Sequence, residues 1–456
     1  MNHKLLEVIE NRNGNYLFPF FWQHGEDEVT LREYMSAING ANIGAVCVES
    51  RPHPDFCGPQ WWHDMDIILD EARKRKRKVW ILDDSHFPTG YANGALEDKP
   101  DSYCRRSITC RTVEAGDEEG IILDEENLAH PEPAKKTAID KEIEKIVNEE
   151  SRLFDGDRLL CVCAREMNSG NVIDLTEKIH NNRLSWDIPS GKWKVYIVHI
   201  TGNAGYHRQY INMMDKASCR LLIDAVYEKH YEHYKGDFGK TIAGFFSDEP
   251  ELGNGHFLRY NNFLGTDQDL PWSAELEERL VEKWGKEFAL KIPLLWINDS
   301  DPDVTAHTRY TYMDAVTRLV ETCFSRQIGD WRRTHGIEYI GHVIEDNNQH
   351  CRTGMSLGHF FRGMSGQDIA GIDVIGNQVT PQGEDSVVTG RVFGNKDGEF
   401  FHYALAKLGA CGALVIFCIF MQKTRLTGLL WEFARYKFAI NCKFIRFSGK
   451  APQTPR

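Results

Sequence analysis

Short apolar runs alternate with stretches of helical spacing along much of the chain. The runs at 16–22 (YLFPFFW), 43–48 (IGAVCV) and 79–82 (VWIL) are almost entirely apolar. Between them, 30–40 and 61–76 carry apolar residues at intervals of three and four, as amphipathic helices do. Strands that are apolar on both faces and separated by helices are typical of a parallel sheet. The pattern therefore predicts an α/β fold with right-handed crossover connections.

The pattern changes between about 107 and 201, where short strands and tight turns replace the helices. It resumes with a helix at 217–234 and with strands at 241–246, 338–344 and Ile372–Ile375. About six βα units predict an incomplete (β/α)8 TIM-type barrel with an inserted small β-sandwich. A doubly wound open sheet is the alternative. No G-x-G-x-x-G turn follows the first strand, so we expect no nucleotide cofactor.

These changes divide the chain into four parts. Residues 1–106 hold the first three barrel strands, 107–205 the inserted β-rich domain, 206–410 strands four to six, and 411–456 an atypical basic and apolar tail. The tail carries eight lysines and arginines against one acid, Glu432, and lacks the period of a packed helix. A truncated or frame-shifted chain would end in this way, and we then expect a largely inactive, poorly soluble fragment. A natural basic tail is the alternative, although such tails are normally polar.

Composition excludes several classes of function. With 41% hydrophobic and 27% charged residues the chain is typical of globular proteins, and its net charge of −13 argues against nucleic-acid binding. No apolar stretch reaches the roughly 18 residues of a membrane span, and the N-terminus has no signal-peptide pattern. Twelve scattered cysteines without a C-x-x-C pair indicate reduced thiols. We expect a cytoplasmic protein with no nucleic-acid and no membrane partner.

Polar residues follow the predicted strands where the apolar runs stop. In a barrel, catalytic groups lie at the carboxyl ends of the strands. One acid at a strand end is often a helix N-cap, but repetition at five ends favours a shared pocket. Acids, imidazoles and aromatic rings together suit a carbohydrate, because rings stack on a sugar and polar groups bond its hydroxyls. The residues expected to bind the sugar are Trp22, His24, Glu49, Arg51, Asp83, Asp84, His86, Asp248, His342 and Asp346.

Cleavage of a glycosidic bond needs a protonated and an ionised carboxyl group. Glu249 is the candidate acid, because the charge of Asp248 beside it would raise its pKa. Glu345, at the next strand end, is the second candidate carboxylate. Retention or inversion of configuration stays open, because the separation of the two groups does not follow from the sequence.

Several segments together resemble one family of enzymes. They are FFWQHGED (20–27), PQWWHDMD (59–66), ILDDSHFPTGYANG (81–94), LSWDIPSGKWKVYIV (184–198), GFFSDEPELG (244–253) and the stretch 342–378. Over about 16–410 the chain resembles the α-L-rhamnosidases of glycoside hydrolase family 106. The resemblance implies a barrel with a β-insert, inverting hydrolysis of rhamnosides, and calcium that assists sugar binding. It also implies that Glu249 matches the strand-four carboxylate of the family.

Two other classes of function stay open. A non-catalytic carbohydrate-binding barrel would need the same aromatic and polar residues, but not Glu249. A metal-dependent hydrolase barrel would use histidines at the strand ends, namely His24, His53, His86 and His342, although the chain has no H-x-H and no H-E-x-x-H. The sequence singles out no set of metal ligands.

Overall fold

The protein contains a six-stranded parallel sheet whose strands follow one another in chain order. The computed structural model describes residues 17–115, 153–181, 183–205, 207–255, 263–375, 378–379, 382–385, 387–389 and 395–412. The strands are β1 (Phe20–Trp22), β2 (Ala45–Glu49), β3 (Lys78–Leu82), β10 (Ile242–Asp248), β12 (Glu338–His342) and β13 (Ile369–Ala370). Every neighbouring pair in the order β1-β2-β3-β10-β12-β13 is parallel. The predicted α/β fold with a parallel sheet is confirmed.

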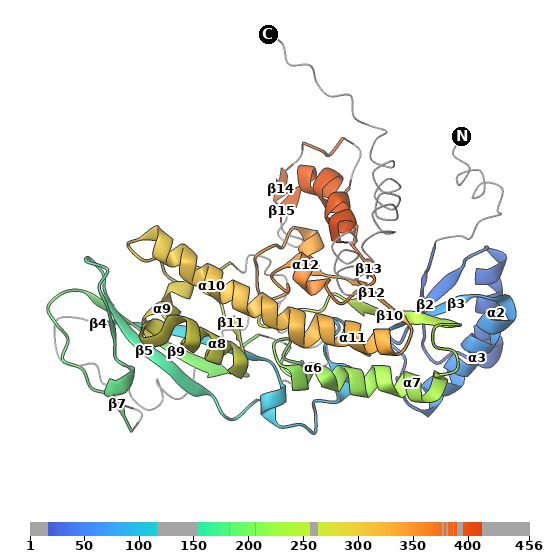
Figure 1. Ribbon diagram of the computed structural model, residues 1–456, viewed down its shortest axis with the longest axis horizontal. Coiled ribbons are helices and arrows are strands. Elements are labelled where there is room, and N and C mark those ends of the chain that lie inside the picture. Colours follow the sequence, from blue (N-terminus) through green and yellow to red (C-terminus); the bar gives the residue numbers. More distant parts are fainter. Residues whose placement is uncertain are drawn as a thin grey trace, which may run out of the picture.

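Helices pack against one face of this sheet (Figure 1). They are α2 (Glu28–Gly40), α3 (Pro59–Arg75), α6 (Lys216–Leu222), α7 (Glu228–Tyr234), α10 (Pro302–Val320) and α11 (Arg326–Thr334). π-helical turns at Ile223–Tyr227 and Glu321–Ser325 connect α6 to α7 and α10 to α11. α3 begins with Pro59, which is favourable in a first turn because the backbone nitrogen there has no partner within the helix. Trp61, Met65 and Ile68 form a buried apolar stripe on the face of α3 towards the sheet.

Successive side chains along a strand point to opposite faces of the sheet, so the strands contribute to two separate apolar clusters, one on each face. The residues of this sheet that join the helices in the main core are Phe21, Val46, Val48, Val79, Ile81, Ile242, Phe245 and Tyr339. The strand residues of the smaller cluster on the opposite face are Ala45, Cys47, Trp80, Leu82, Ala243, Phe246 and Ile340. Phe20 lies against Phe246, with ring centroids 5.2 Å apart, yet remains 50% exposed. This second face is therefore only partly covered.

The sixth strand differs from the prediction, and the predicted incomplete barrel is not confirmed. The strand is Ile369–Ala370, whereas the predicted segment Ile372–Ile375 has no regular structure. β12 ends at His342, and the backbone N–H of Asp373 donates instead to the Asp346 carboxylate (2.7 Å) in the turn after that strand. Within the part of the chain that the structure describes, β1 and β13 each pair on one side only, so closure into a barrel is not confirmed.

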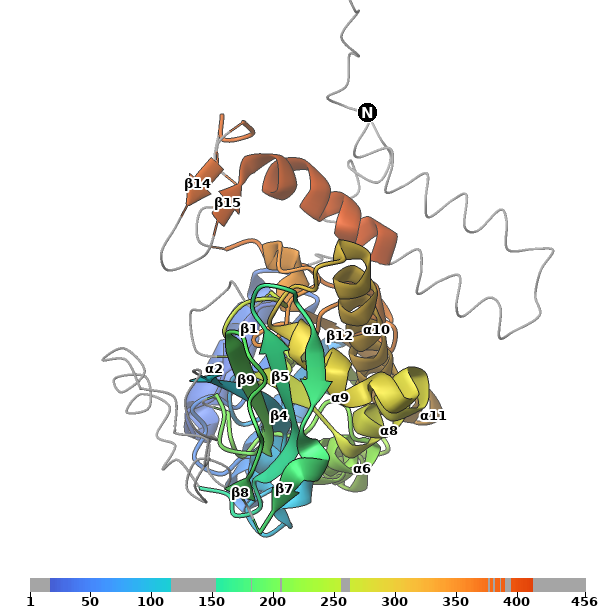
Figure 2. The same ribbon diagram turned by 90° about the vertical axis from the view of Figure 1, so that its left-hand side faces the viewer.

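The predicted β-sandwich is a single antiparallel sheet with different covers on its two faces (Figure 2). Its order is β11-β4-β9-β5-β6, made of β11 (Leu270–Trp272), β4 (Arg106–Ala115), β9 (Trp193–Thr201), β5 (Arg158–Glu166) and β6 (Val172–Asp174). One face packs against Leu184 of the hairpin β7 (Ile179–His180) and β8 (Arg183–Leu184), and against Trp186. On the other, the Cys163 thiol donates to the Ala289 carbonyl of α9 (Phe288–Lys291), so a helix takes the place of a second sheet.

The remaining described elements lie later in the chain. They are α8 (Ala274–Trp284), α12 (Phe360–Gly363), the hairpin β14 (Val387–Thr389) and β15 (Asn395–Asp397), and a helix that begins with a π-helical turn at Phe400–Ala404 and continues to residue 412. The predicted tail lies outside the described residues from 413 onwards, so its origin stays a prediction. Among the helices that are described, none combines the length and the apolar character needed to cross a membrane.

Candidate functional site

The carboxyl ends of β2, β10 and β12 bring charged residues together. β10 is apolar from Ile242 to Phe246 and then carries Ser247 and Asp248. In the register of the sheet Asp248 lies opposite His342, the last residue of β12, and Glu49 ends β2. Because parallel strands end at the same edge of a sheet, sequence positions about 50, 250 and 340 meet at one place.

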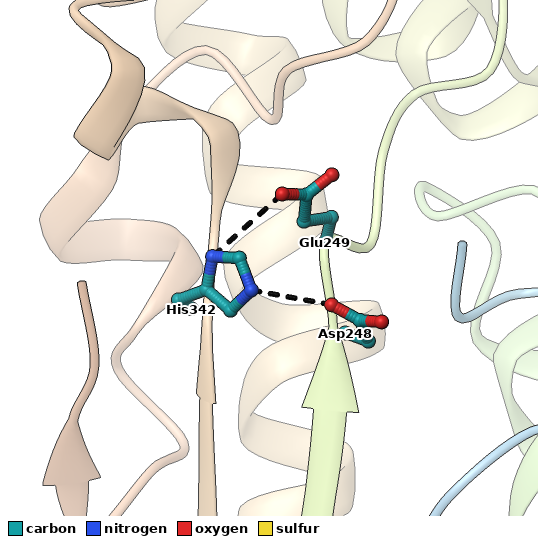
Figure 3. A group of neighbouring side chains, drawn as sticks. All are labelled: Asp248, Glu249 and His342. Atoms are coloured by element: carbon teal, nitrogen blue, oxygen red, sulfur yellow. Dashed lines mark hydrogen bonds and ion pairs between the residues drawn. The ribbon is translucent and has the colours of Figure 1, made fainter. Parts of the chain in front are cut away.

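Ion pairs link these residues into one group. Arg51 Nε lies 2.8 Å from Glu49 Oε1, and Arg51 Nη2 lies 2.8 Å from Asp248 Oδ2. On the other side of Asp248, its Oδ1 lies 3.2 Å from His342 Nε2 (Figure 3). We call Glu49, Arg51, Asp248, Glu249, His342 and Asp346 the charged cluster.

His342 is surrounded by carboxylates on both of its ring nitrogens. Its Nδ1 lies 3.2 Å from Asp346 Oδ2 and 3.9 Å from Glu249 Oε1. Burial alone would lower the pKa of this imidazole, but hydrogen bonds to Asp248 and Asp346 hold its pKa well above the usual value. His342 is therefore a charged imidazolium at neutral pH, with a proton on each nitrogen.

The two carboxyl groups at the end of β10 have opposite electrostatic environments. Burial would raise the pKa of Asp248, but His342 and Arg51 outweigh it and hold that pKa below its usual value. Burial also raises the pKa of Glu249, and here the net result is a pKa of about 8. The positive charge of His342 lowers this pKa, and the negative charges of Asp248 and Asp346 raise it. At neutral pH a protonated Glu249 therefore stands beside an ionised Asp248.

Glu249 is held in an uncommon backbone conformation. Its φ angle is +46°, in the left-handed region that non-glycine residues rarely occupy. The turn directs its carboxyl group back towards His342 of the next strand (Figure 3). Its side chain keeps 14% of its surface exposed, so the acidic proton can reach a bound molecule.

The outer members of the charged cluster are more fully buried. Burial raises the pKa of Glu49, against the effect of Arg51, and raises the pKa of Asp346, against the effect of His342. Asp346 also accepts the backbone N–H of Asp373. These contacts hold Arg51 and His342 in place on either side of Asp248.

Four residues with exposed or partly exposed side chains lie around the cluster or near it. Trp22 is 57% exposed, and a hydrogen bond joins its side chain to that of Glu49. Phe87 is 45% exposed, with the guanidinium carbon of Arg51 5.6 Å from its ring centroid. His86 is exposed and lies edge-on to Tyr91. His24 pairs with Glu26 (2.8 Å) rather than with the cluster.

Asp83 and Asp84 lie beneath the surface, with 0% exposure. The Asp84 carboxylate accepts backbone N–H groups from Ser85, Gly90, Ala92 and Asn93, and so shapes the loop after β3. Asp83 accepts hydroxyl groups from Thr89, Tyr227 and Ser247. Both residues thus organise the protein next to the charged cluster, and neither presents an atom to solvent.

Glu345 is not brought into the charged cluster. It is fully buried, accepts the Ser356 hydroxyl (2.5 Å), and has a pKa that burial raises to about 7. Its neighbour Asp346 faces His342 instead. Both acids lie in the 3-10 turn Ile344–Asn347 that follows β12, where they face different directions. The sequence alone does not say which one faces the site.

The sequence interpretation missed the hydroxyl groups of Thr89, Tyr227, Ser247 and Tyr339. Ser247 Oγ accepts the Tyr339 hydroxyl (2.8 Å), and Tyr227 reaches Asp83 from the helix preceding β10. Ser247, one residue before Asp248, was the detectable signal, because a hydroxyl interrupts an otherwise apolar strand. The tyrosines resemble ordinary core residues in their helix and strand.

One group of side chains within the described ranges could hold a metal ion. Asp248, Glu249 and His342 each place a ligand atom within 4.8 Å of the other two. Calcium takes six to eight oxygen ligands, whereas this set contains an imidazole, and Asp248 is already paired with Arg51. The residues do not fit calcium, and a mixed nitrogen and oxygen set suits a transition metal better.

Comparison with known proteins finds no matching family model and no matching curated protein. Among solved structures, the chain is similar to a rhamnosidase from Novosphingobium sp. PP1Y, with a TM-score of 0.46 and 11% identity over 77% of this chain and 47% of that one. It is also similar to a β-galactosidase from the psychrophilic Marinomonas ef1, with a TM-score of 0.36 and 11% identity over 86% and 47%. The chain thus spans about half the length of both structures, and neither likeness assigns it a family or an activity.

Proposed function

We propose that this protein is a glycoside hydrolase that cleaves the glycosidic bond of a neutral sugar or deoxysugar, with Glu249 as the general acid. The observation that carries the proposal is the pair of carboxyl groups at the end of β10. Asp248 is paired with Arg51 and His342, whereas Glu249 is largely buried, which raises its pKa to about 8. Two neighbouring carboxyl groups with separated pKa values are the arrangement that acid-catalysed glycoside cleavage uses.

In this proposal Glu249 donates its proton to the glycosidic oxygen as the bond to the anomeric carbon breaks. Positive charge then develops on the sugar ring, and the ionised Asp248 stabilises it electrostatically. Arg51 and His342 keep Asp248 ionised and fix its orientation. Water then forms the new bond to the anomeric carbon and returns a proton to the ionised Glu249. The net reaction adds one water molecule across the glycosidic bond and restores the acid.

The second carboxylate is assigned differently from the sequence-based expectation. Glu345 would need to be ionised and to reach the sugar, whereas its burial and raised pKa keep it largely protonated below pH 7. Asp248 and Glu249 have oxygen atoms within 4.8 Å of each other, closer than the roughly 6.5–9.5 Å separation of an inverting pair. The geometry therefore favours Asp248 over Glu345 as the carboxylate that acts with Glu249.

The surroundings of the cluster favour a neutral sugar. Besides the proposed acid Glu249, the cluster contains three acids, Glu49, Asp248 and Asp346, and only two cations, so an anionic ligand would meet repulsion. Trp22 and Phe87 offer exposed rings for the apolar face of a sugar. The motifs that resemble α-L-rhamnosidases make an α-L-rhamnoside the first substrate to test.

One observation favours a metal-dependent hydrolase as a second candidate. Asp248, Glu249 and His342 form a three-residue group of possible ligands. Against it, His342 donates from both nitrogens and Asp248 is paired with Arg51, so a metal ion would have to displace Arg51 and deprotonate His342.

The experiment is a panel of nitrophenyl glycosides incubated with the full chain, with and without a chelator, alongside a measurement of sugar binding. We expect nitrophenol release from a deoxysugar glycoside, unchanged by the chelator. Release that stops on chelation would establish the metal-dependent alternative. Sugar binding by a folded chain without release from any glycoside would establish the non-catalytic carbohydrate-binding alternative and contradict the proposal.

A further inference from the structure

A fully buried carboxyl group joins three parts of the chain behind the charged cluster. Asp83 lies at the end of β3 with 0% exposure. Its Oδ1 accepts the Thr89 hydroxyl (2.7 Å), and its Oδ2 accepts the Tyr227 hydroxyl (2.6 Å) and the Ser247 hydroxyl. These donors come from the loop after β3, from the helix before β10 and from β10 itself. Burial raises the pKa of Asp83 to about 7, against the effect of these hydrogen bonds.

The carboxylate fixes the direction of the hydrogen bonds around it. Above its pKa of about 7 the ionised Asp83 carboxylate only accepts, so each of the three hydroxyl groups then points its proton at Asp83. The lone pairs of these hydroxyl oxygens then point away from Asp83 and can accept other hydrogen bonds. Thr89 Oγ1 accepts the backbone N–H of Asp248 (2.9 Å), and Ser247 Oγ accepts the Tyr339 hydroxyl (2.8 Å).

This arrangement reaches the cluster through Thr89. The Thr89 backbone N–H donates to the Asp248 carbonyl (2.9 Å), so Thr89 holds both main-chain polar groups of Asp248. The next residue, Glu249, has a left-handed backbone that must be held by its surroundings. Downstream, the Glu251 backbone N–H donates to Tyr210 Oη (3.2 Å), whose hydroxyl donates to the Thr89 carbonyl. Thr89 therefore supports the Asp248–Glu249 turn from both sides.

We propose that Asp83 is a positioning residue: by setting the direction of the Thr89 and Ser247 hydroxyl groups, it holds the Asp248–Glu249 turn in the geometry needed for proton transfer. It touches neither the cluster side chains nor solvent, so it acts through Thr89. The inference rests on the proposed role of Glu249, and extends it to a residue that the sequence places at the same edge of the sheet.

The test compares Asp83→Asn with the wild-type full chain. An amide has the same shape but donates from its nitrogen, so at least one of the three hydroxyl groups must turn its proton away from residue 83 and lose its present donor bond. Misplacing a catalytic group by about 1 Å costs on the order of 100-fold in rate. We expect kcat to fall on that scale, with KM changed by less than about threefold, since the residue contacts no substrate. Glu71→Gln, which removes a buried carboxylate from an ion-pair network on α3, is the matched control and should keep kcat.

A second pair of variants separates positioning from folding. Thr89→Val removes the hydroxyl that joins Asp83 to Asp248, while Thr89→Ser keeps it, so only the valine variant should lose kcat. A readout without turnover is the NMR titration of the His342 imidazole, which lies 3.2 Å from Asp248 Oδ1. Its midpoint should move in Asp83→Asn and in Thr89→Val, and stay in place in Thr89→Ser and Glu71→Gln.

The inference is overturned if Thr89→Val keeps both the wild-type kcat and the wild-type His342 midpoint. This result is decisive even when Asp83→Asn does not fold, because the valine variant leaves Asp83 intact. Failure of the proposed function has a different signature. Full activity of Glu249→Gln would remove the acid role, while the His342 midpoints would still report whether Asp83 positions the turn.

Discussion

At the scale of single residues, His342 determines how the charged cluster behaves. It is a buried imidazolium between Asp248 and Asp346, and its positive charge lowers the pKa of Glu249 against burial and against the surrounding acids. Without this charge Glu249 would stay protonated at still higher pH. His342 thus holds the proposed acid near the pH at which it can both carry and release a proton.

Replacing His342 by glutamine should move the alkaline limb of the pH profile. In the wild type, kcat/KM should decline as pH rises through about 8, the pKa of Glu249. In His342→Gln that pKa rises further, because a cation is lost and the charges of Asp248 and Asp346 remain. The alkaline limb of kcat/KM should therefore shift to higher pH, even if the maximal rate falls. His63→Gln, an exposed histidine on α3, serves as control. A limb that stays in place or shifts to lower pH would contradict this account of His342.

At the scale of secondary-structure elements, β10 is the strand on which the site depends. It pairs with β3 on one side and β12 on the other, with an irregularity in register between Ile242 and Gly244. A Cβ atom added to Gly244 would lie within 3.0 Å of the Glu338 carbonyl oxygen and of the Trp80 ring. Glycine is therefore required there for the three strands to approach each other.

Gly244→Ala should be strongly destabilising. Overpacking a buried site costs about 1–3 kcal/mol, and here the clash involves backbone that cannot easily move. We expect the free energy of unfolding, measured by urea titration, to fall by an amount of that order. In Gly236→Ala the new methyl group meets no atom within 4 Å, so its free energy of unfolding should stay within about 1 kcal/mol of wild type. Equal stabilities for the two variants would show that β10 is not packed as described.

The same strands show how far sequence reasoning reaches. Apolar runs ending in polar residues predicted β1, β2, β3, β10 and β12. A strand that is buried on both faces is apolar at successive positions, and such a run can be recognised in the sequence. The strand β13 was misplaced, since the choice between 369–370 and 372–375 depends on a bond from Asp373 to Asp346. The antiparallel sheet was recognised but not its helical cover, which comes from residues more than 100 positions away. Partners such as Thr89 and Tyr227 depend on long-range register, which no local pattern encodes.

At the scale of the whole molecule, burial raises the pKa values of several carboxyl groups to neutrality or above it. Burial raises the pKa of Asp83 and Glu345 to about 7 and that of Glu249 to about 8. In the unfolded chain these groups would ionise at about pH 4. The folded protein therefore holds protons that the unfolded chain releases, and this linkage makes its stability depend on pH.

Stability should fall as pH rises from about 6.5 to 8.5. A group with a raised folded-state pKa stabilises the fold fully below its unfolded pKa, and this contribution is lost as pH rises through the folded pKa. At lower pH His230, whose pKa burial lowers to about 4, acts in the opposite direction. Above about pH 6.5 His342, whose pKa is raised, adds to the fall, so a carboxyl variant is needed to isolate a carboxyl group. Urea unfolding midpoints across this window measure the slope, and Glu345→Gln should flatten it. Midpoints that rise with pH here would contradict the raised pKa values of the buried carboxyl groups.

The central claim is that Glu249 protonates the leaving group of a glycoside. The most direct measurement compares wild type and Glu249→Gln on two glycosides of the same sugar, one with an alkyl leaving group and one with a dinitrophenyl leaving group. An alkoxide needs the proton and a dinitrophenolate does not. The account predicts a loss of about 100- to 10,000-fold in kcat/KM for the alkyl glycoside and a far smaller loss for the dinitrophenyl glycoside. Equal losses on both substrates, or no loss on either, would contradict it.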